Sequence, residues 1–205
     1  VTPGGVGWMT AGSGIVHTER TPPEQRGGGE YPLHGYQIWV ALPKDKEDMA
    51  PEFSYTEAND LPAWEEGNLS FKLVAGDGYG RKSPVPVHSA LFMIEVRANA
   101  DTTLFTGDNL KGEIGICVVE GHITACNDRI EAGNLMVSKA EDTCSVEVSK
   151  GSHLLLFGGQ PFAEERFINW NFVSSSQEKI NAARVRWQQR QFEMVPGETG
   201  YVPLP

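Results

Sequence analysis

The amino-acid sequence predicts an all-β fold that ends in one α-helix. Short segments of alternating apolar and polar residues recur along the chain, and its 23 glycines and 13 prolines are spread among the turns between them. A helical pattern occurs at the C-terminal end, after residue 175. Hydrophobic residues make up 40% of the 205 positions, which suffices for a core.

The first two predicted strands lie at the N-terminus. Residues 6–10 alternate in the manner of a strand, residues 12–14 (Gly-Ser-Gly) predict a turn, and residues 15–19 predict the returning strand. Residues two apart on a strand share a face, so His17 and Glu19 would point the same way. The pair could form the edge of a metal site inside a barrel, or it could belong to a solvated strand face.

Residues 1–75 contain only part of a barrel. Further strands are predicted at 35–41 and 69–75, with a weaker one at 53–56. A jelly-roll barrel needs about eight strands, or roughly 65–95 residues, so about half a barrel is present. The chain starts at Val1 without an initiator Met. We therefore expect that the first strands of this barrel lie outside the sequence, and that open strand edges promote self-association.

Residues 87–175 predict a complete second barrel. Phe92, Ile94 and Val96 alternate with more polar residues and should face its core. The predicted strands are Ala90–Arg97, Thr102–Phe105, Glu113–Val119, His122–Ala125, Arg129–Ile130, Leu135–Lys139, Cys144–Val148, His153–Phe157 and Phe167–Phe172. The Gly- and Pro-rich stretch 76–86 matches neither the P-loop nor the dinucleotide spacing, and we interpret it as the linker between the barrels.

A short internal alignment compares the two barrels. When residues 3–8 are laid on residues 132–137, His17 falls on Val146 and Glu19 on Val148. Valine cannot bind a metal, so we expect a metal-free second barrel. The histidines of the second half, His88, His122 and His153, are too scattered to form a ligand set and should be structural or exposed.

Residues 176–205 predict a helix and an extended tail. Ser175 and Glu178 fit a capping box, and Ile180, Ala183 and Trp187 mark one face at helical spacing. This face should pack on a barrel.

Charge and cysteine content exclude several classes of protein. With 17 Lys and Arg against 27 Asp and Glu, the net charge is −10, which argues against binding to nucleic acid or to an acidic membrane surface. The sequence has no apolar run of membrane-spanning length and no visible signal peptide. Cys117, Cys126 and Cys144 lack Cys-x-x-Cys spacing, which favours reduced thiols in a cytoplasmic protein.

Three blocks of the sequence resemble the pirin family. Residues 7–19, Gly-Trp-Met-Thr-Ala-Gly-Ser-Gly-Ile-Val-His-Thr-Glu, resemble its signature, and residues 32–43 and 167–176 resemble further blocks. The resemblance implies two cupin-type jelly-roll barrels, with one metal ion in the first. It also implies that His17 and Glu19 are two of four ligands. The other two would come from an upstream His-Pro-His-like pair that this sequence does not contain.

The same resemblance implies a cofactor and two alternative functions. Fe(II) is the expected metal, with Mn, Ni, Cu or Co as alternatives, while this chain by itself could be metal-free. The chain would belong to a quercetin 2,3-dioxygenase-type oxidoreductase acting on a flavonol, with Glu19 as a ligand or as the acceptor of the phenolic proton. The alternative is a non-enzymatic, metal- or redox-responsive regulator that binds protein partners.

Overall fold

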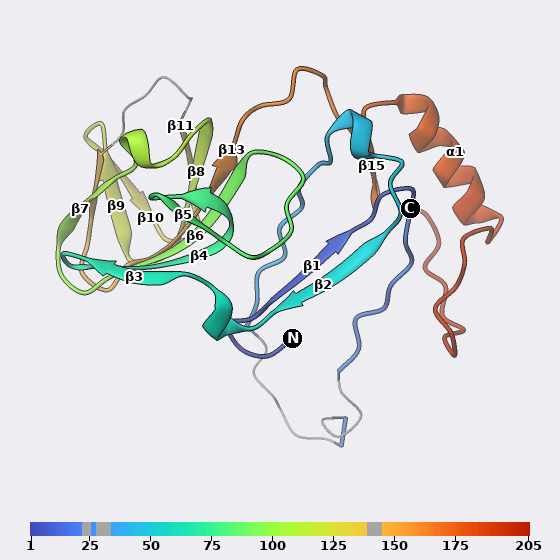
Figure 1. The fold of residues 1–205 in the computed structure, drawn as a ribbon, viewed down its shortest axis with the longest axis horizontal. Coiled ribbons are helices and arrows are strands. Elements are labelled where there is room, and N and C mark those ends of the chain that lie inside the picture. Colours follow the sequence, from blue (N-terminus) through green and yellow to red (C-terminus); the bar gives the residue numbers. More distant parts are fainter. Residues whose placement is uncertain (22–25, 28–33, 139–144) are drawn as a thin grey trace. The chain divides into compact units, whose positions relative to one another are not determined.

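The computed structural model describes residues 1–21, 26–27, 34–138 and 145–205 of the chain (Figure 1). Within them it is rich in strands and contains one α-helix, α1 (Gln177–Gln188). The strands are β1 (Val6–Thr10), β2 (Glu52–Thr56), β3 (Ala63–Glu66), β4 (Leu69–Gly78), β5 (Arg81–Lys82), β6 (Leu91–Ala98), β7 (Thr102–Phe105), β8 (Glu113–Glu120), β9 (His122–Ala125), β10 (Asp128–Glu131), β11 (Leu135–Ser138), β12 (Ser145–Val148), β13 (His153–Gly159), β14 (Phe167–Asn169) and β15 (Phe172–Ser174). Short 3-10 helices are η2 (Lys44–Lys46), η3 (Ala58–Asp60) and η4 (Gly107–Asn109).

The chain divides into two compact units, which are described separately. The barrel unit consists of residues 1–9 and 53–163, and the terminal unit of residues 10–52 and 164–205. Within the described residues, no helix is long and apolar enough to cross a membrane.

The barrel unit is built from two antiparallel sheets around one core. The larger sheet runs β11-β8-β13-β6-β4-β3, with β5 paired to β4, and the smaller runs β10-β9-β12-β7. Both sheets contribute side chains with no exposed surface, among them Leu73 and Ile94 from the larger sheet and Leu104, Ile123 and Val146 from the smaller. Inward-facing apolar residues on two facing sheets are the arrangement of a jelly-roll barrel.

Most strands predicted for this region are confirmed. Thr102–Phe105 and His122–Ala125 have the predicted bounds, and Phe92, Ile94 and Val96 are at most 2% exposed, as their alternation predicts. The predicted strand ends Lys139 and Cys144 lie outside the described residues.

Two stretches of the barrel unit contain regular structure that the sequence analysis does not predict. Within 76–86, β4 continues to Gly78 and β5 pairs back on it in a tight hairpin, while the role of this stretch as the linker between two barrels stays a prediction. Its two turn residues, Tyr79 and Gly80, have φ angles of 50° and 69°, as a two-residue hairpin turn requires. The acidic stretch around Trp64 is also regular: it forms β3, where Trp64 stacks on Phe71 of β4 at 4.9 Å between ring centroids. The predicted boundary at residue 75 therefore falls inside a strand, while the assignment of 1–75 to a first barrel stays a prediction.

The N-terminal strands are confirmed only in part. The strands predicted at 6–10 and 53–56 form as β1 and β2, which make a separate two-stranded sheet. The strands predicted at 15–19 and 35–41 are wrong, since neither stretch pairs as a strand in the described residues. A strand needs a neighbour to take up its backbone hydrogen bonds, and these stretches have none there.

The C-terminal part of the terminal unit differs from the prediction at two points. The strand predicted at 167–172 is a hairpin, β14 and β15, which turns at Trp170 with a φ of 51°. Helix α1 is capped by Ser176, whose hydroxyl accepts a hydrogen bond from the Lys179 amide at 3.4 Å, instead of by Ser175. The predicted face is the one that packs, since Ile180 is buried and Ala183 and Trp187 are half-buried. Helix α1 contacts β14 and β15, and its packing on a barrel stays a prediction.

Candidate functional site

The segment that carries His17 and Glu19 begins at a well-defined turn. The Gly14 amide donates to the Ala11 carbonyl, and the Ser13 amide donates to the Met49 carbonyl, both at 2.9 Å. Gly12 has a φ of 50°, and a Cβ atom at that position would lie 2.1 Å from the Met49 oxygen. Only glycine fits this close approach. The turn therefore fixes where the next segment starts.

Both predicted ligand residues are exposed in the terminal unit. Glu19 accepts a weak hydrogen bond from the Gln37 side-chain amide at 3.4 Å, which places it beside the stretch that follows His34. His34 is itself engaged with the Tyr36 hydroxyl at 3.0 Å. The first two sequence blocks that resemble the pirin family thus contact each other through Glu19 and Gln37. His17 and Glu19 are not committed to the core and stay available to a ligand.

These residues suit a metal in kind but do not complete a site. An imidazole nitrogen and a carboxylate oxygen are suitable donors for Fe, Mn, Ni, Cu or Co. In the part of the chain that the structure describes, no group of three or more His, Cys, Asp or Glu side chains is placed to hold a metal ion. Two donors leave most of a coordination sphere open, so the pair alone is at most half of a four-ligand centre.

In the barrel unit, the positions that align with His17 and Glu19 are buried and apolar. Val146 and Val148 on β12 are 0% and 2% exposed and belong to the hydrophobic core. His153 is 2% exposed, and its Nε2 lies 3.0 Å from Glu95 Oε1, which identifies it as a structural histidine of the barrel wall.

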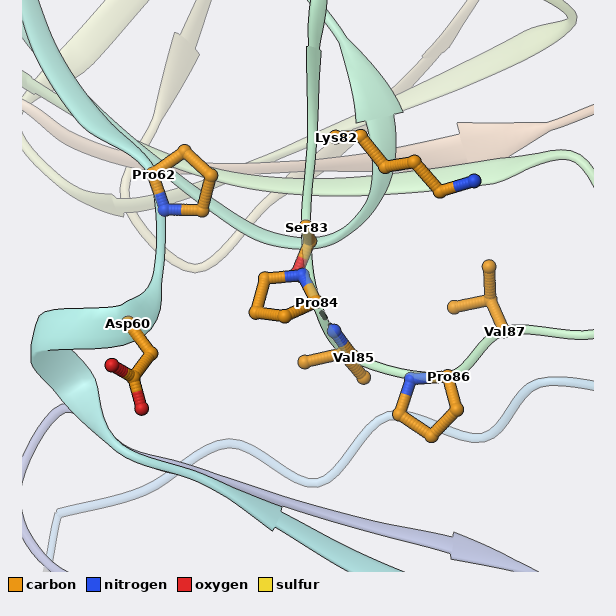
Figure 2. A pocket seen from close by; sticks show the side chains of 8 residues that line it. All are labelled: Asp60, Pro62, Lys82, Ser83, Pro84, Val85, Pro86 and Val87. Carbon is orange, nitrogen blue, oxygen red and sulfur yellow. Dashed lines mark hydrogen bonds between the residues drawn. The ribbon is translucent and has the colours of Figure 1, made fainter.

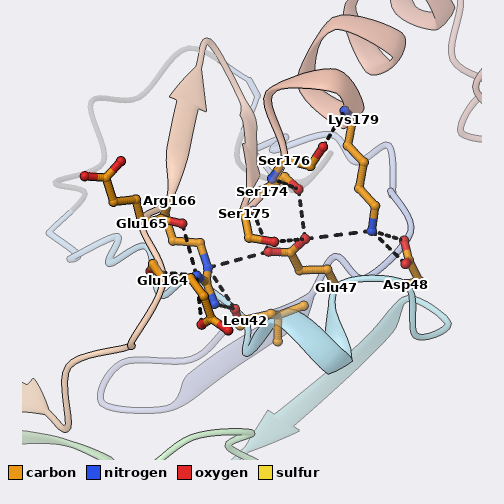
Figure 3. Close-up of polar contacts among 10 residues, drawn as sticks. All are labelled: Leu42, Glu47, Asp48, Glu164, Glu165, Arg166, Ser174, Ser175, Ser176 and Lys179. Carbon is orange, nitrogen blue, oxygen red and sulfur yellow. Dashed lines mark hydrogen bonds and ion pairs between the residues drawn. The ribbon is translucent and has the colours of Figure 1, made fainter.

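A buried carboxylate that sequence reasoning missed organises the terminal unit (Figure 3). Glu47 accepts hydrogen bonds from the Ser174 hydroxyl at 2.8 Å, the Ser175 amide at 2.6 Å and the Ser175 hydroxyl at 3.2 Å. The Arg166 guanidinium lies 3.5 Å from the same carboxylate, and both side chains are nearly buried. Buried charges are stable only when they are paired and hydrogen-bonded in this way.

Contacts around Glu47 fix residues 42–48, and through Met49 they hold the turn that precedes His17 and Glu19. Arg166 also donates to the Leu42 carbonyl through Nε and Nη2, at 3.3 and 3.0 Å. Lys179 binds Asp48 with contacts of 2.7 and 2.8 Å, a hydrogen bond that raises the pKa of this lysine. Residues 42–48 are thereby fixed, and Met49 directly after them receives the Ser13 amide. No local pattern marks Glu47 as buried, because its serine partners lie 127 and 128 positions away in the sequence.

Comparisons with known proteins match both ends of the chain. The family model of the pirin C-terminal cupin domain matches residues 92–193, and the pirin model matches residues 1–40. A "Pirin-like protein" of Caulobacter vibrioides is 34% identical over 207 residues, covering 100% of this chain and 70% of that protein. A Pseudomonas aeruginosa protein named "Putative quercetin 2,3-dioxygenase" is 33% identical and covers 92% of this chain. The chain spans 58% of that second relative's length.

Solved structures of similar proteins have the same fold. A crystal structure of quercetin 2,3-dioxygenase from Acinetobacter baumannii superposes with a TM-score of 0.73 at 30% identity, covering 82% of this chain and 56% of the other. A second structure from the same organism has a TM-score of 0.77 at 22% identity, which supports the fold alone. The predicted all-β cupin architecture with a C-terminal helix is confirmed. From its match over the whole length of the chain to a pirin-like relative, and from both family models, we conclude that this chain belongs to the pirin family of cupin proteins.

Proposed function

We propose that this chain contributes His17 and Glu19 to the mononuclear metal site of a pirin-type dioxygenase that acts on flavonols such as quercetin. One observation carries the proposal: the segment that matches the pirin model, residues 1–40, contains an imidazole and a carboxylate that are exposed and two positions apart. Similarity to the Pseudomonas aeruginosa and Acinetobacter baumannii proteins supports the substrate class.

The two residues would have distinct roles. A bound Fe(II), or Mn, Ni, Cu or Co in its place, supplies open coordination positions for dioxygen and for substrate oxygens. His17 offers an imidazole nitrogen donor. Glu19, which Gln37 orients through its 3.4 Å contact, is a second donor or the base that takes the flavonol hydroxyl proton.

Metal stoichiometry tests the ligand assignment. We expect this chain alone to retain little Fe(II) after desalting, because two donors bind weakly. A chimera with the upstream segment of the Caulobacter vibrioides relative joined to Val1 should bind about one equivalent, as one four-ligand site predicts. In the chimera, His17→Ala and Glu19→Gln should each remove most of the metal, whereas His122→Ala in the second barrel should not. Full metal content without His17 would refute the assignment.

Oxygen uptake tests the reaction. The loaded chimera should consume dioxygen when quercetin is added, and Glu19→Gln should abolish that consumption. Stoichiometric metal with no turnover would contradict the dioxygenase proposal and favour a metal-responsive regulator.

A further inference from the structure

The C-terminal tail, residues 189–205, follows α1 and folds back on that helix. The Trp187 indole nitrogen donates to the Val202 carbonyl at 2.8 Å, and the Tyr201 ring stacks on Trp187 at 5.4 Å between ring centroids. The Tyr201 hydroxyl also donates to the Trp187 carbonyl at 3.3 Å. These contacts fix the C-terminal tail within the terminal unit, to which the segment that carries His17 and Glu19 also belongs.

The C-terminal tail contacts this segment first at Gly14, three positions before His17. The Phe192 ring lies so close to Gly14 that a Cβ atom there would come within 2.9 Å of the ring carbon Cε1. The ring of Phe192 is itself held by Trp187, at 5.8 Å between ring centroids, and by the Arg186 guanidinium, which lies over it at 4.3 Å. Gly14 therefore packs against a ring whose position is set by α1.

The second contact is at Arg20, the residue directly after Glu19. The Arg20 guanidinium donates from Nη2 to Glu198 Oε2 and forms an ion pair with it. The Glu198 amide in turn donates to the Val195 carbonyl at 3.0 Å, so that a turn of the C-terminal tail sets where the carboxylate lies. The two contacts thus lie on either side of the two predicted ligands.

We infer that the C-terminal tail positions His17 and Glu19 for metal binding, an inference that rests on the proposed function. Phe192 and Glu198 are its positioning residues. Residues 15–20 form no strand among the described residues, so sheet hydrogen bonds do not determine their course. Donors that are already ordered lose less conformational freedom when a metal binds, and they bind it more tightly. The C-terminal tail would therefore raise the metal affinity without contacting the metal.

Backbone order parameters from nitrogen-15 relaxation test the positioning in the full chain without added metal. We expect residues 15–20 to lie nearer to the rigid value of about 0.85 than to the flexible range below about 0.6. Phe192→Ala should move them into the flexible range, and Phe192→Leu should preserve most of the order. Glu198→Gln should cause a smaller decrease. The reversed pair, Arg20→Glu with Glu198→Arg, should restore the order that either single reversal removes.

Titration with Ni(II) tests the consequence for metal binding. Ni(II) is paramagnetic, and its binding should broaden the imidazole NMR signals of His17. Phe192→Ala should weaken this binding by about tenfold, because the metal must then order backbone that the ring holds in the parent. Glu198→Gln and Arg20→Gln should each weaken it by about two- to fivefold, as an exposed ion pair predicts. The double variant should bind no more weakly than either single variant, since both remove the same pair.

Three exposed residues supply matched controls. Glu193→Gln and Val202→Ala change the C-terminal tail at positions whose side chains are exposed. Lys82→Gln removes a positive charge, as Arg20→Gln does, from the exposed strand β5 of the barrel unit (Figure 2). All three should leave the order parameters of residues 15–20 and the Ni(II) affinity unchanged.

The inference is overturned if the order of residues 15–20 is the same in the parent and the tail variants, or if Ni(II) affinity does not fall when that order falls. Glu198→Gln and the reversed pair decide this even if Phe192→Ala unfolds the terminal unit. A parent whose His17 signals do not respond to Ni(II) would instead refute the ligand assignment, while loss of order in the tail variants would still support the role of the C-terminal tail in holding the segment.

Discussion

The stretch around His17 and strand β12 were both predicted to be strands, and they have different structures. The internal alignment places His17 and Glu19 on Val146 and Val148. The two valines lie in a strand between β7 and β9 with their side chains in the core. The two polar residues are exposed and lie outside any strand in the described residues.

The difference shows that a strand forms where its side chains alternate between core and solvent and where neighbouring strands pair with it. β12 aligns Val146 with Leu104 on one side and Val148 with Ile123 on the other, so that both backbone and side chains are satisfied. The 15–19 stretch, Ile-Val-His-Thr-Glu, lacks this alternation and has no adjacent strand among the described residues. A pattern with period two therefore determines which face would be buried, and tertiary pairing determines whether burial happens.

The largest expected effect comes from a charge in the core of β12. Val146→Asp should destabilise the barrel unit by about 4 kcal/mol or more, because a carboxylate with no partner would be buried. Val137→Asp is the matched control, since Val137 is 66% exposed on β11 and should change stability by about 0.5 kcal/mol. Urea unfolding measures both. Equal losses would mean that β12 is not the buried strand described above.

The next effect concerns Glu47 in the terminal unit. Glu47→Ala should cost about 3 kcal/mol, because Arg166 would be left nearly buried without its carboxylate. Asp48→Asn is the control: its side chain is 75% exposed and its pair with Lys179 is screened by solvent, so this variant should keep nearly the stability of the parent. Amide hydrogen exchange in α1 would report the loss. If the two variants exchange alike, the Glu47 cluster does not hold this unit together.

Tyr79 makes the barrel unit sensitive to alkaline pH. Burial, assisted by the nearby Glu66 charge, raises the pKa of Tyr79 above its ordinary value of 10.0. The folded state then retains a proton that the unfolded state releases, so stability is complete below pH 10 and falls as the pH rises beyond it. Relative to Tyr79→Phe, the parent should lose up to about 1.4 kcal/mol per pH unit above pH 10. Denaturation series at pH 8 to 11 check this, and parallel curves would contradict it.

The smallest effect identifies the serine that caps α1. Ser176→Ala should destabilise the helix by about 1 kcal/mol, because the Lys179 amide loses its acceptor. Ser176→Asp should restore most of that loss, since aspartate also caps helices well. Helix content by circular dichroism during thermal unfolding distinguishes these variants. A variant as stable as the parent would show that Ser176 does not act as the cap.

The sequence predicted the parts of the fold that depend on neighbours in the sequence. The strands from residue 90 to 157 follow from their alternation, and α1 follows from its packing face. The turn at Trp170 and the long-range side-chain contacts were not predicted from the sequence. The hairpin at 167–174 depends on Trp170 adopting a left-handed backbone, which its residue type does not favour. Ser176 caps α1 in place of the predicted Ser175, because Ser175 binds Glu47, a residue 128 positions away. The ligand roles of His17 and Glu19 stay predictions, since two exposed donors do not by themselves show a metal.

The Glu47 cluster has a consequence for the order in which the chain is synthesised. Glu47 leaves the ribosome well before Arg166, Ser174 and Ser175, while every residue of the barrel unit is complete by residue 163. The barrel unit can fold while the Glu47 carboxylate is still exposed to solvent. The terminal unit can fold only after Arg166, Ser174 and Ser175 have been synthesised. Translation that stops between residues 163 and 174 would therefore release a product whose barrel unit is complete and whose terminal unit lacks serine partners of Glu47.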